Sequence, residues 1–176
     1  MGTRLMYFET GDFQYVDLSY GDRRFSMALF LPKEGRDPDD LIPDFTAGNW
    51  NQWTGSYDST DVILGMPRFK VEYKTLLNDV LISMGMGVAF SGSADFSGIN
   101  PDGELYISRV IHQTFVEVNE EGTEAAAVTV VELRETSAGG SGPVHMTLNR
   151  PFLFVIWDHE TGSILFMGKI VDPTLS

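Results

Sequence analysis

The sequence predicts an α+β fold that is mostly antiparallel β-sheet with few helices. Two runs rich in aromatic and aliphatic residues, 13–20 and 25–31, flank the turn-like tetrapeptide 21–24. Only one segment, 75–84, has a strong helical period, and no repeat or clear linker divides the chain. These observations indicate one domain built mainly from hairpins.

The first third of the chain reads as β-structure followed by a polar stretch. Residues 5–31 form strands, with a hairpin centred on 21–24, and Pro32 ends the second run of that hairpin. Residues 37–40 (Asp-Pro-Asp-Asp) have the composition of a helix start. Trp50 and Trp53 are three residues apart and can therefore share one helical face.

The middle of the chain contains the helix that the sequence favours most. A short apolar run at 62–64 precedes 69–73, which alternates as a half-buried strand does. In residues 75–84, the apolar side chains fall on one face, Thr75 can cap the start, and Gly85 can end the helix.

The last part of the chain is predicted to be loop and strand. Residues 91–104 are rich in Ser, Gly and Asp and are predicted as loop, and 105–118 is a long β run. Two further strands, 152–157 and 164–171, are joined by a turn at 159–162.

Composition excludes several classes of function. The chain has 176 residues, a formal charge of −13 and 43% hydrophobic residues. An acidic surface disfavours nucleic acid and anionic membranes as partners, while the apolar content suffices for a core. Without cysteine, disulfides and thiolate metal sites are impossible. No stretch of about 18 apolar residues that could span a membrane is present.

No catalytic motif emerges, so we do not expect an enzyme, a metal or a cofactor. His112, His145 and His159 lie outside any HExxH or HxH pattern, and no GxSxG is present. Gly85-x-Gly87 lacks the third glycine of a dinucleotide loop, because residue 90 is phenylalanine.

The segment 119–142 combines conflicting local preferences. Residues 120–127 favour helix, residues 128–133 favour strand, and the Gly-rich tract 138–142 follows. If the segment is extended, one face carries only uncharged residues: Thr123, Ala125, Ala127, Thr129, Val131 and Leu133. Glu124, Glu132 and Arg134 lie on the other face, and Gly122 can act as a hinge. The pattern therefore fits a strand that enters a gap in a sheet; the alternative is an ordinary hairpin arm.

Ordered motifs in this sequence are similar to those of the serpin family. Residues 120–127 (EEGTEAAA) resemble the hinge of inhibitory serpins, and 149–156 (NRPFLFVI) resembles the signature that follows the reactive-centre loop. Further matches lie at 66–69, 94–99, 108–112 and 166–173. The resemblance implies the C-terminal portion of a serpin fold with an exposed reactive-centre loop. It makes residues 1–176 a single partial domain, with hinge and loop at 120–142, and leaves the N-terminal half without a counterpart.

The resemblance implies a serine protease inhibitor that acts as a suicide substrate, not an enzyme. After cleavage, the loop would insert into the main sheet and trap the acylated protease. The hinge residues would be Gly122, Thr123, Glu124, Ala125, Ala126 and Ala127. A non-inhibitory binding module is the alternative, and the isolated fragment is expected to be inactive. The family also suggests an extracellular or secreted protein.

Individual site residues carry over by position. Hinge spacing puts the reactive bond at Thr136–Ser137, which suits an elastase-like or subtilisin-like protease; Arg134 is the alternative, for a trypsin-like protease. Counting back from Pro151 instead suggests Gly140–Ser141. Arg68 and Glu120 match a breach pair at the top of the insertion path, with an ordinary surface ion pair as the alternative. His112 matches the shutter histidine, in a structural role.

Overall fold

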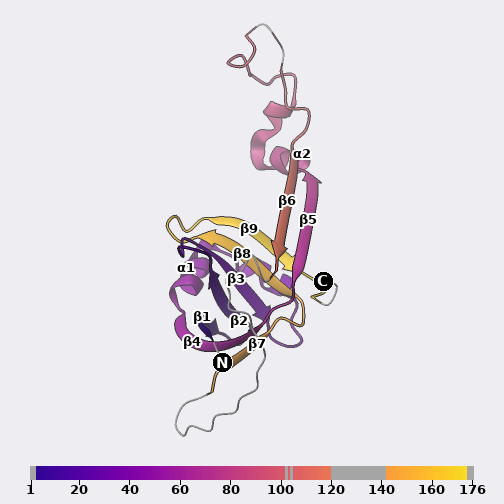
Figure 1. The fold of residues 1–176 in the computed structure, drawn as a ribbon. Helices are drawn as coiled ribbons and strands as arrows, with labels where there is room; N and C mark the ends of the chain where they lie inside the picture. Colours follow the sequence, from indigo (N-terminus) through magenta and orange to yellow (C-terminus); the bar gives the residue numbers. More distant parts are fainter. Residues whose placement is uncertain (1–2, 102, 104, 120–141, 174–176) are drawn as a thin grey trace. The chain divides into compact units, whose positions relative to one another are not determined.

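A computed structural model describes residues 3–101, 103, 105–119 and 142–173 (Figure 1). The chain forms two compact units, one from Met1–Phe69 with Val118–Ser176 and one from Lys70–Glu117. The expectation of a single partial domain stays a prediction. Each unit is described below by itself.

The larger unit contains a seven-stranded sheet in the order β7-β4-β1-β2-β3-β8-β9. The strands are β1 (Thr3–Glu9), β2 (Phe13–Ser19), β3 (Phe25–Pro32), β4 (Asp58–Gly65), β7 (Val144–Thr147), β8 (Phe152–Asp158) and β9 (Ile164–Ile170). All neighbouring pairs are antiparallel except β4 and β7. The α+β class with mostly antiparallel sheet is therefore confirmed.

The predicted hairpin is present as β2 and β3. Tyr20 N–H donates to Phe25 O at 2.8 Å, and the register pairs Ser19 with Ser26. Gly21 and Arg23 adopt positive φ values of 42° and 68°, which such a tight reversal needs. Among the residues that the structure describes, Arg23 is the one non-glycine residue with a positive φ.

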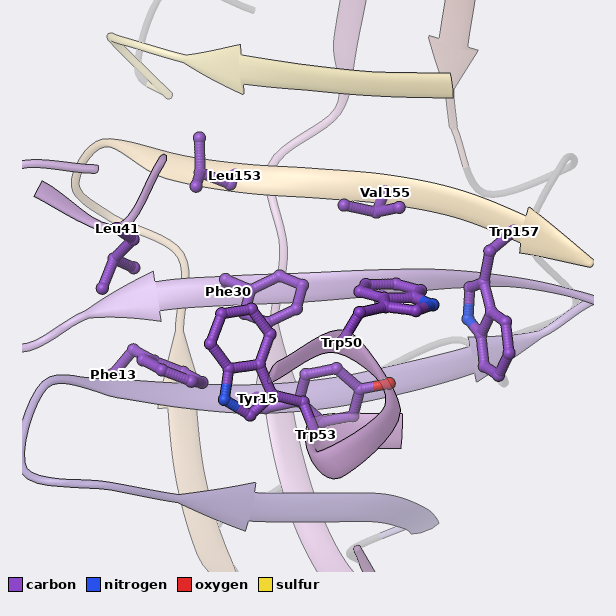
Figure 2. Close-up of a cluster of buried hydrophobic side chains, with 10 residues drawn as sticks. Phe13, Tyr15, Phe30, Leu41, Trp50, Trp53, Leu153, Val155 and Trp157 are labelled. Atoms are coloured by element: carbon purple, nitrogen blue, oxygen red, sulfur yellow. The ribbon is translucent and has the colours of Figure 1, made fainter. Parts of the chain in front are cut away.

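Two tryptophans fasten helix α1 (Ala47–Gly55) to the sheet (Figure 2). Thr46 caps the helix, since its Oγ1 accepts from Asn49 N–H at 3.2 Å. Trp50 and Trp53 are both buried, as their spacing predicts, and both rings contact Phe30 of β3. Burying an aromatic side chain of this size contributes about 2–3 kcal/mol relative to leaving it exposed.

The stretch between β3 and α1 contains two short 3₁₀ turns, η1 (Pro38–Asp40) and η2 (Ile42–Asp44). Asp37 caps η1, because its carboxylate accepts from Asp39 N–H at 2.9 Å while Asp40 reaches back to Asp37 N–H. The predicted helix start at 37–40 is thus a single turn, which ends at Leu41.

The smaller unit contains a two-stranded sheet of β5 (Phe69–Leu76) and β6 (Ile111–Val118), whose arrows run in opposite directions in Figure 1. Between them lie α2 (Asn78–Leu81), the π-type turn η3 (Ile82–Met86) and η4 (Gly87–Phe90).

The prediction of a helix over residues 75–84 is wrong. Thr75 and Leu76 belong to β5, and α-helix extends only over Asn78–Leu81. Pairing with β6 overrides the local helical period, and Gly85, at φ 96°, breaks the helix further on. The face expected to be buried is exposed instead: Met84 is 74% exposed.

The predicted β run over 105–118 is only partly correct, because β6 begins at Ile111. The two C-terminal strands and their turn are confirmed as β8 and β9, with Gly162 at φ 68° in the turn. Strand β7 was not predicted.

Candidate functional site

The segment that carries the sequence-based site lies between β6 and β7. Residues 120–141 fall outside the described residues. The predictions for Glu120, for the hinge Gly122–Ala127, and for Arg134, Thr136 and Ser137 therefore remain predictions. The described structure shows how the chain enters and leaves this segment.

Strand β6 leads into the segment with one face buried at its end. Val116 and Val118 are 8% and 5% exposed, whereas Phe115 on the other face is 53% exposed. Lys70 Nζ of β5 lies 5.1 Å from the centre of the Phe115 ring, a cation–π contact between the two strands. Lys70 also forms an ion pair with Glu72 at 3.1 Å.

His112 is exposed on β6, on the same face as Val116 and Val118. Its Nε2 lies 2.8 Å from Thr114 Oγ1, two residues along the same strand. The expected shutter role of His112, which requires a bond across strands, stays a prediction.

Arg68 lies at the end of the connection between β4 and β5 and is exposed. The next residue, Phe69, is buried, with its ring 5.8 Å from Phe152 and 5.5 Å from Phe154. This aromatic cluster fixes the backbone from which Arg68 projects. The proposed pairing of Arg68 with Glu120 is untested, because Glu120 lies outside the described residues.

Strand β7 anchors the chain as it leaves the segment. It pairs in parallel with β4, in a register that sets Val62 against Val144, and Met146 is fully buried. Gln14 Nε2 donates to the His145 backbone oxygen at 3.3 Å, and Leu148 N–H donates to Gly65 O at 2.8 Å. From Val144 on, the chain is therefore held in the seven-stranded sheet.

A buried carboxylate fixes β8, the strand that follows β7. Asp17 of β2 is 3% exposed and accepts from Tyr15 OH at 3.0 Å and from Trp157 Nε1 at 2.9 Å. Burial raises the pKa of Tyr15, and the neighbouring Asp17 charge adds to the rise. His159 lies over Trp157, with ring centres 3.9 Å apart, and its Nε2 contacts Ser26 Oγ at 2.6 Å.

The end of β8 carries an ion pair. Arg24 Nη2 lies 3.1 Å from Asp158 Oδ2, and the Arg24 side chain holds the pKa of that carboxyl below its usual range. Sequence reasoning missed both this pair and Asp17, because their partners lie 134 and 140 residues away along the chain.

Neither a metal site nor a membrane-spanning helix is found in the part of the chain that the structure describes. No three or more acidic or histidine side chains gather there in a way that could hold a metal ion. No helix there is long and apolar enough to cross a membrane.

Comparison with known proteins identifies the family. The family model "Serpin (serine protease inhibitor)" matches residues 2–173. Human Serpin I2 is 38% identical over 97% of this chain, and the match covers 42% of that protein. The native structure of the thermophilic serpin tengpin aligns with a TM-score of 0.76 and 34% identity, covering 98% of this chain and 45% of tengpin.

A further similar structure is thyroxine-binding globulin in complex with thyroxine, at a TM-score of 0.81 and 26% identity. It covers 98% of this chain and 45% of the globulin chain. The chain thus spans less than half the length of the relatives that it matches here. The fold, the ordered motifs and the family match agree, and the chain belongs to the serpin family.

Proposed function

We propose that residues 1–176 form the C-terminal part of a serpin domain that inhibits serine proteases as a suicide substrate. The observation that carries the proposal is the alternation after Gly122, where six successive odd-numbered positions, 123–133, bear no charge. A strand that enters a sheet needs one face free of charge, because an unpaired charge buried there is costly. The first residues on that face, Thr123, Ala125 and Ala127, are small, so they offer little steric resistance when the strand enters the sheet.

The structure on either side of residues 120–141 favours a reactive-centre loop over an ordinary hairpin arm. Residues 119–143 join the end of β6 to the start of β7, which is 25 residues. Hairpin connections commonly have about 2–5 residues, and a much longer connection in a compact domain is usually functional. The two flanking strands also belong to different sheets.

The proposed chemistry is an interrupted proteolysis. The protease serine attacks the Thr136 carbonyl, an ester forms with its Oγ, and the Thr136–Ser137 bond breaks with Ser137 leaving as a protonated amine. Residues N-terminal to Thr136, which remain attached to β6, then insert as a strand and carry the acylated protease with them. An elastase-like or subtilisin-like protease suits Thr136, and a trypsin-like protease would select Arg134 instead.

Arg68, Glu120 and His112 have supporting roles in this proposal. Arg68 and Glu120 form an ion pair that helps to hold the insertion path closed at its upper end before cleavage. His112, beside Thr114, offers a hydrogen bond to the strand that enters. The isolated chain is inactive in this proposal, and the complete protein acts outside the cell.

The test uses a complete serpin domain that contains residues 1–176, mixed with elastase and, separately, with trypsin. A protease complex that survives SDS is the expected result, and mass spectrometry of the released peptide identifies its first residue, Ser137 or Glu135. Ala125→Arg, on the uncharged face, should abolish the complex while cleavage continues. Glu124→Arg, on the opposite face, is the matched control and should retain it. Equal behaviour of the two variants would refute insertion by this face.

A non-inhibitory binding module is the second candidate, favoured by the similarity to a globulin whose structure holds thyroxine. Such a module would be cleaved in the loop without forming a complex. Its melting temperature would also not rise after cleavage, because no strand would be added. Thermal unfolding of the cleaved and uncleaved domain therefore separates the two candidates.

A further inference from the structure

The residues just before β6 are held by the side chain of Asn78 as well as by the backbone. Asn78 Oδ1 accepts from Val110 N–H at 2.8 Å, and Asn78 Nδ2 donates to Ser108 O at 3.0 Å. Just before it, Leu77 N–H donates to Val110 O at 2.9 Å. The two polar atoms of one amide therefore bond to two peptide groups about 30 residues further along the chain. We call these two bonds the Asn78 clip.

The Asn78 clip extends the hydrogen bonding between the two chain segments beyond the end of β5. Strand β5 ends at Leu76, and α2 begins at Asn78, so the Asn78 peptide group turns into the helix. The side-chain amide offers an acceptor and a donor, as a peptide group does, and it adds two bonds beside the backbone bond from Leu77 to Val110. Aspartate lacks the donor, and alanine lacks both. Strand β6 begins at Ile111 rather than at residue 105, because the residues just before it bond to a side chain instead of to a neighbouring strand.

Register in this part of the molecule depends on few contacts. A two-stranded sheet is marginal by itself, and a slip of one residue moves every side chain to the other face. Within the described part of the smaller unit, Val116 is the one buried residue, so packing does little to fix the strand. Lys70 of β5 and Phe115 of β6 make a cation–π contact between the two strands.

We propose that Asn78 is a positioning residue for loop insertion: its clip sets the register of β6 on β5 and keeps β6 in place as the strand beside which the cleaved loop lies. This inference rests on the proposed function, because β6 leads directly into the hinge. A β6 that slips would present Phe115 where Val116 belongs. Insertion would slow, and more of the acylated protease would escape by hydrolysis.

The first test needs no protease. Amide hydrogen exchange is measured on the 176-residue chain for the wild type, Asn78→Ala, Asn78→Asp and Ser83→Ala. Loss of one net hydrogen bond should speed exchange at Val110 by roughly tenfold in Asn78→Ala, with an intermediate effect in Asn78→Asp. Ser83→Ala is the matched control, since it removes a 2.7 Å bond to Val80 O in the same segment without reaching β6. Unchanged exchange at Val110 would overturn the clip.

The second test uses the complete domain and measures the stoichiometry of inhibition alongside the rate of loop cleavage. Asn78→Ala should raise the stoichiometry several-fold and leave the cleavage rate unchanged, while Ser83→Ala matches the wild type. If Asn78→Ala speeds exchange at Val110 but leaves the stoichiometry unchanged, the positioning role is wrong. A wild-type domain that forms no protease complex overturns the proposed function and the positioning role together, whereas exchange at Val110 still decides whether the clip holds β6.

Discussion

Replacing Gly168 by alanine should destabilise the seven-stranded sheet through a single steric conflict. Gly168 of β9 lies directly opposite Phe154 of β8, and a Cβ at position 168 would lie 2.5 Å from Cε1 and Cζ of that ring. Carbon atoms in contact prefer about 3.5–4.0 Å, so the ring has to move by about 1 Å. Phe154 is 2% exposed and packs on Phe69, with ring centres 5.5 Å apart, so it has little room to move.

Overpacking of this kind costs about 1–3 kcal/mol. A loss of about 2 kcal/mol lowers the Tm of a chain of this length by about 4–8 °C. The assay is urea unfolding of the 176-residue chain, followed by tryptophan fluorescence and circular dichroism. Phe154→Leu should recover part of the loss when it is combined with Gly168→Ala. Gly11→Ala is the control, because a Cβ at Gly11 would meet nothing within 4 Å. Equal stability of Gly168→Ala and Gly11→Ala would refute the steric argument.

Three further predictions concern burial and charge. The folded-state pKa of Asp158 lies below its unfolded value of about 3.9, so its pairing with Arg24 stabilises the fold above that pH and loses this effect as the pH falls below it. As the pH falls from 6 to 2, the free energy of unfolding should therefore fall less steeply in Arg24→Gln than in the wild type. Asp17→Ala leaves the buried Trp157 Nε1–H without its acceptor and should destabilise the chain by about 2 kcal/mol, more than Asp17→Asn does; urea unfolding measures both. The isolated chain should self-associate through exposed apolar side chains, and Met84→Glu should reduce this in sizing experiments; a clean wild-type monomer would contradict the prediction.

Local patterns predicted the elements that local contacts determine. The β2–β3 hairpin follows from two apolar runs around a turn, and the burial of Trp50 and Trp53 follows from their spacing. Strand β7 has four residues and pairs with β4 about 80 residues earlier, so no nearby pattern marks it. The helix predicted from Thr75 is wrong because of another distant pairing: Thr75 and Leu76 belong to β5, which pairs with β6 more than 30 residues later.

In the candidate site, too, some residues are predicted from local motifs and others are not. The hinge and the reactive bond remain predictions from sequence motifs, because residues 120–141 fall outside the described residues. The Asn78 clip cannot be predicted in this way. Nothing near Asn78 indicates that its amide bonds to Ser108 and Val110, and its place after β5 becomes visible only when the strand is known to end at Leu76.

The position of β8 between β3 and β9 has a consequence for a nicked molecule. A cut after Thr136 separates the part of the chain that starts at Ser137 from the part before it. The later part would carry β8 with Phe152, Phe154 and Val155 in the sheet interior, so it should stay attached under native conditions. Gel filtration would then show one particle before and after cutting, and only denaturant would release the later part.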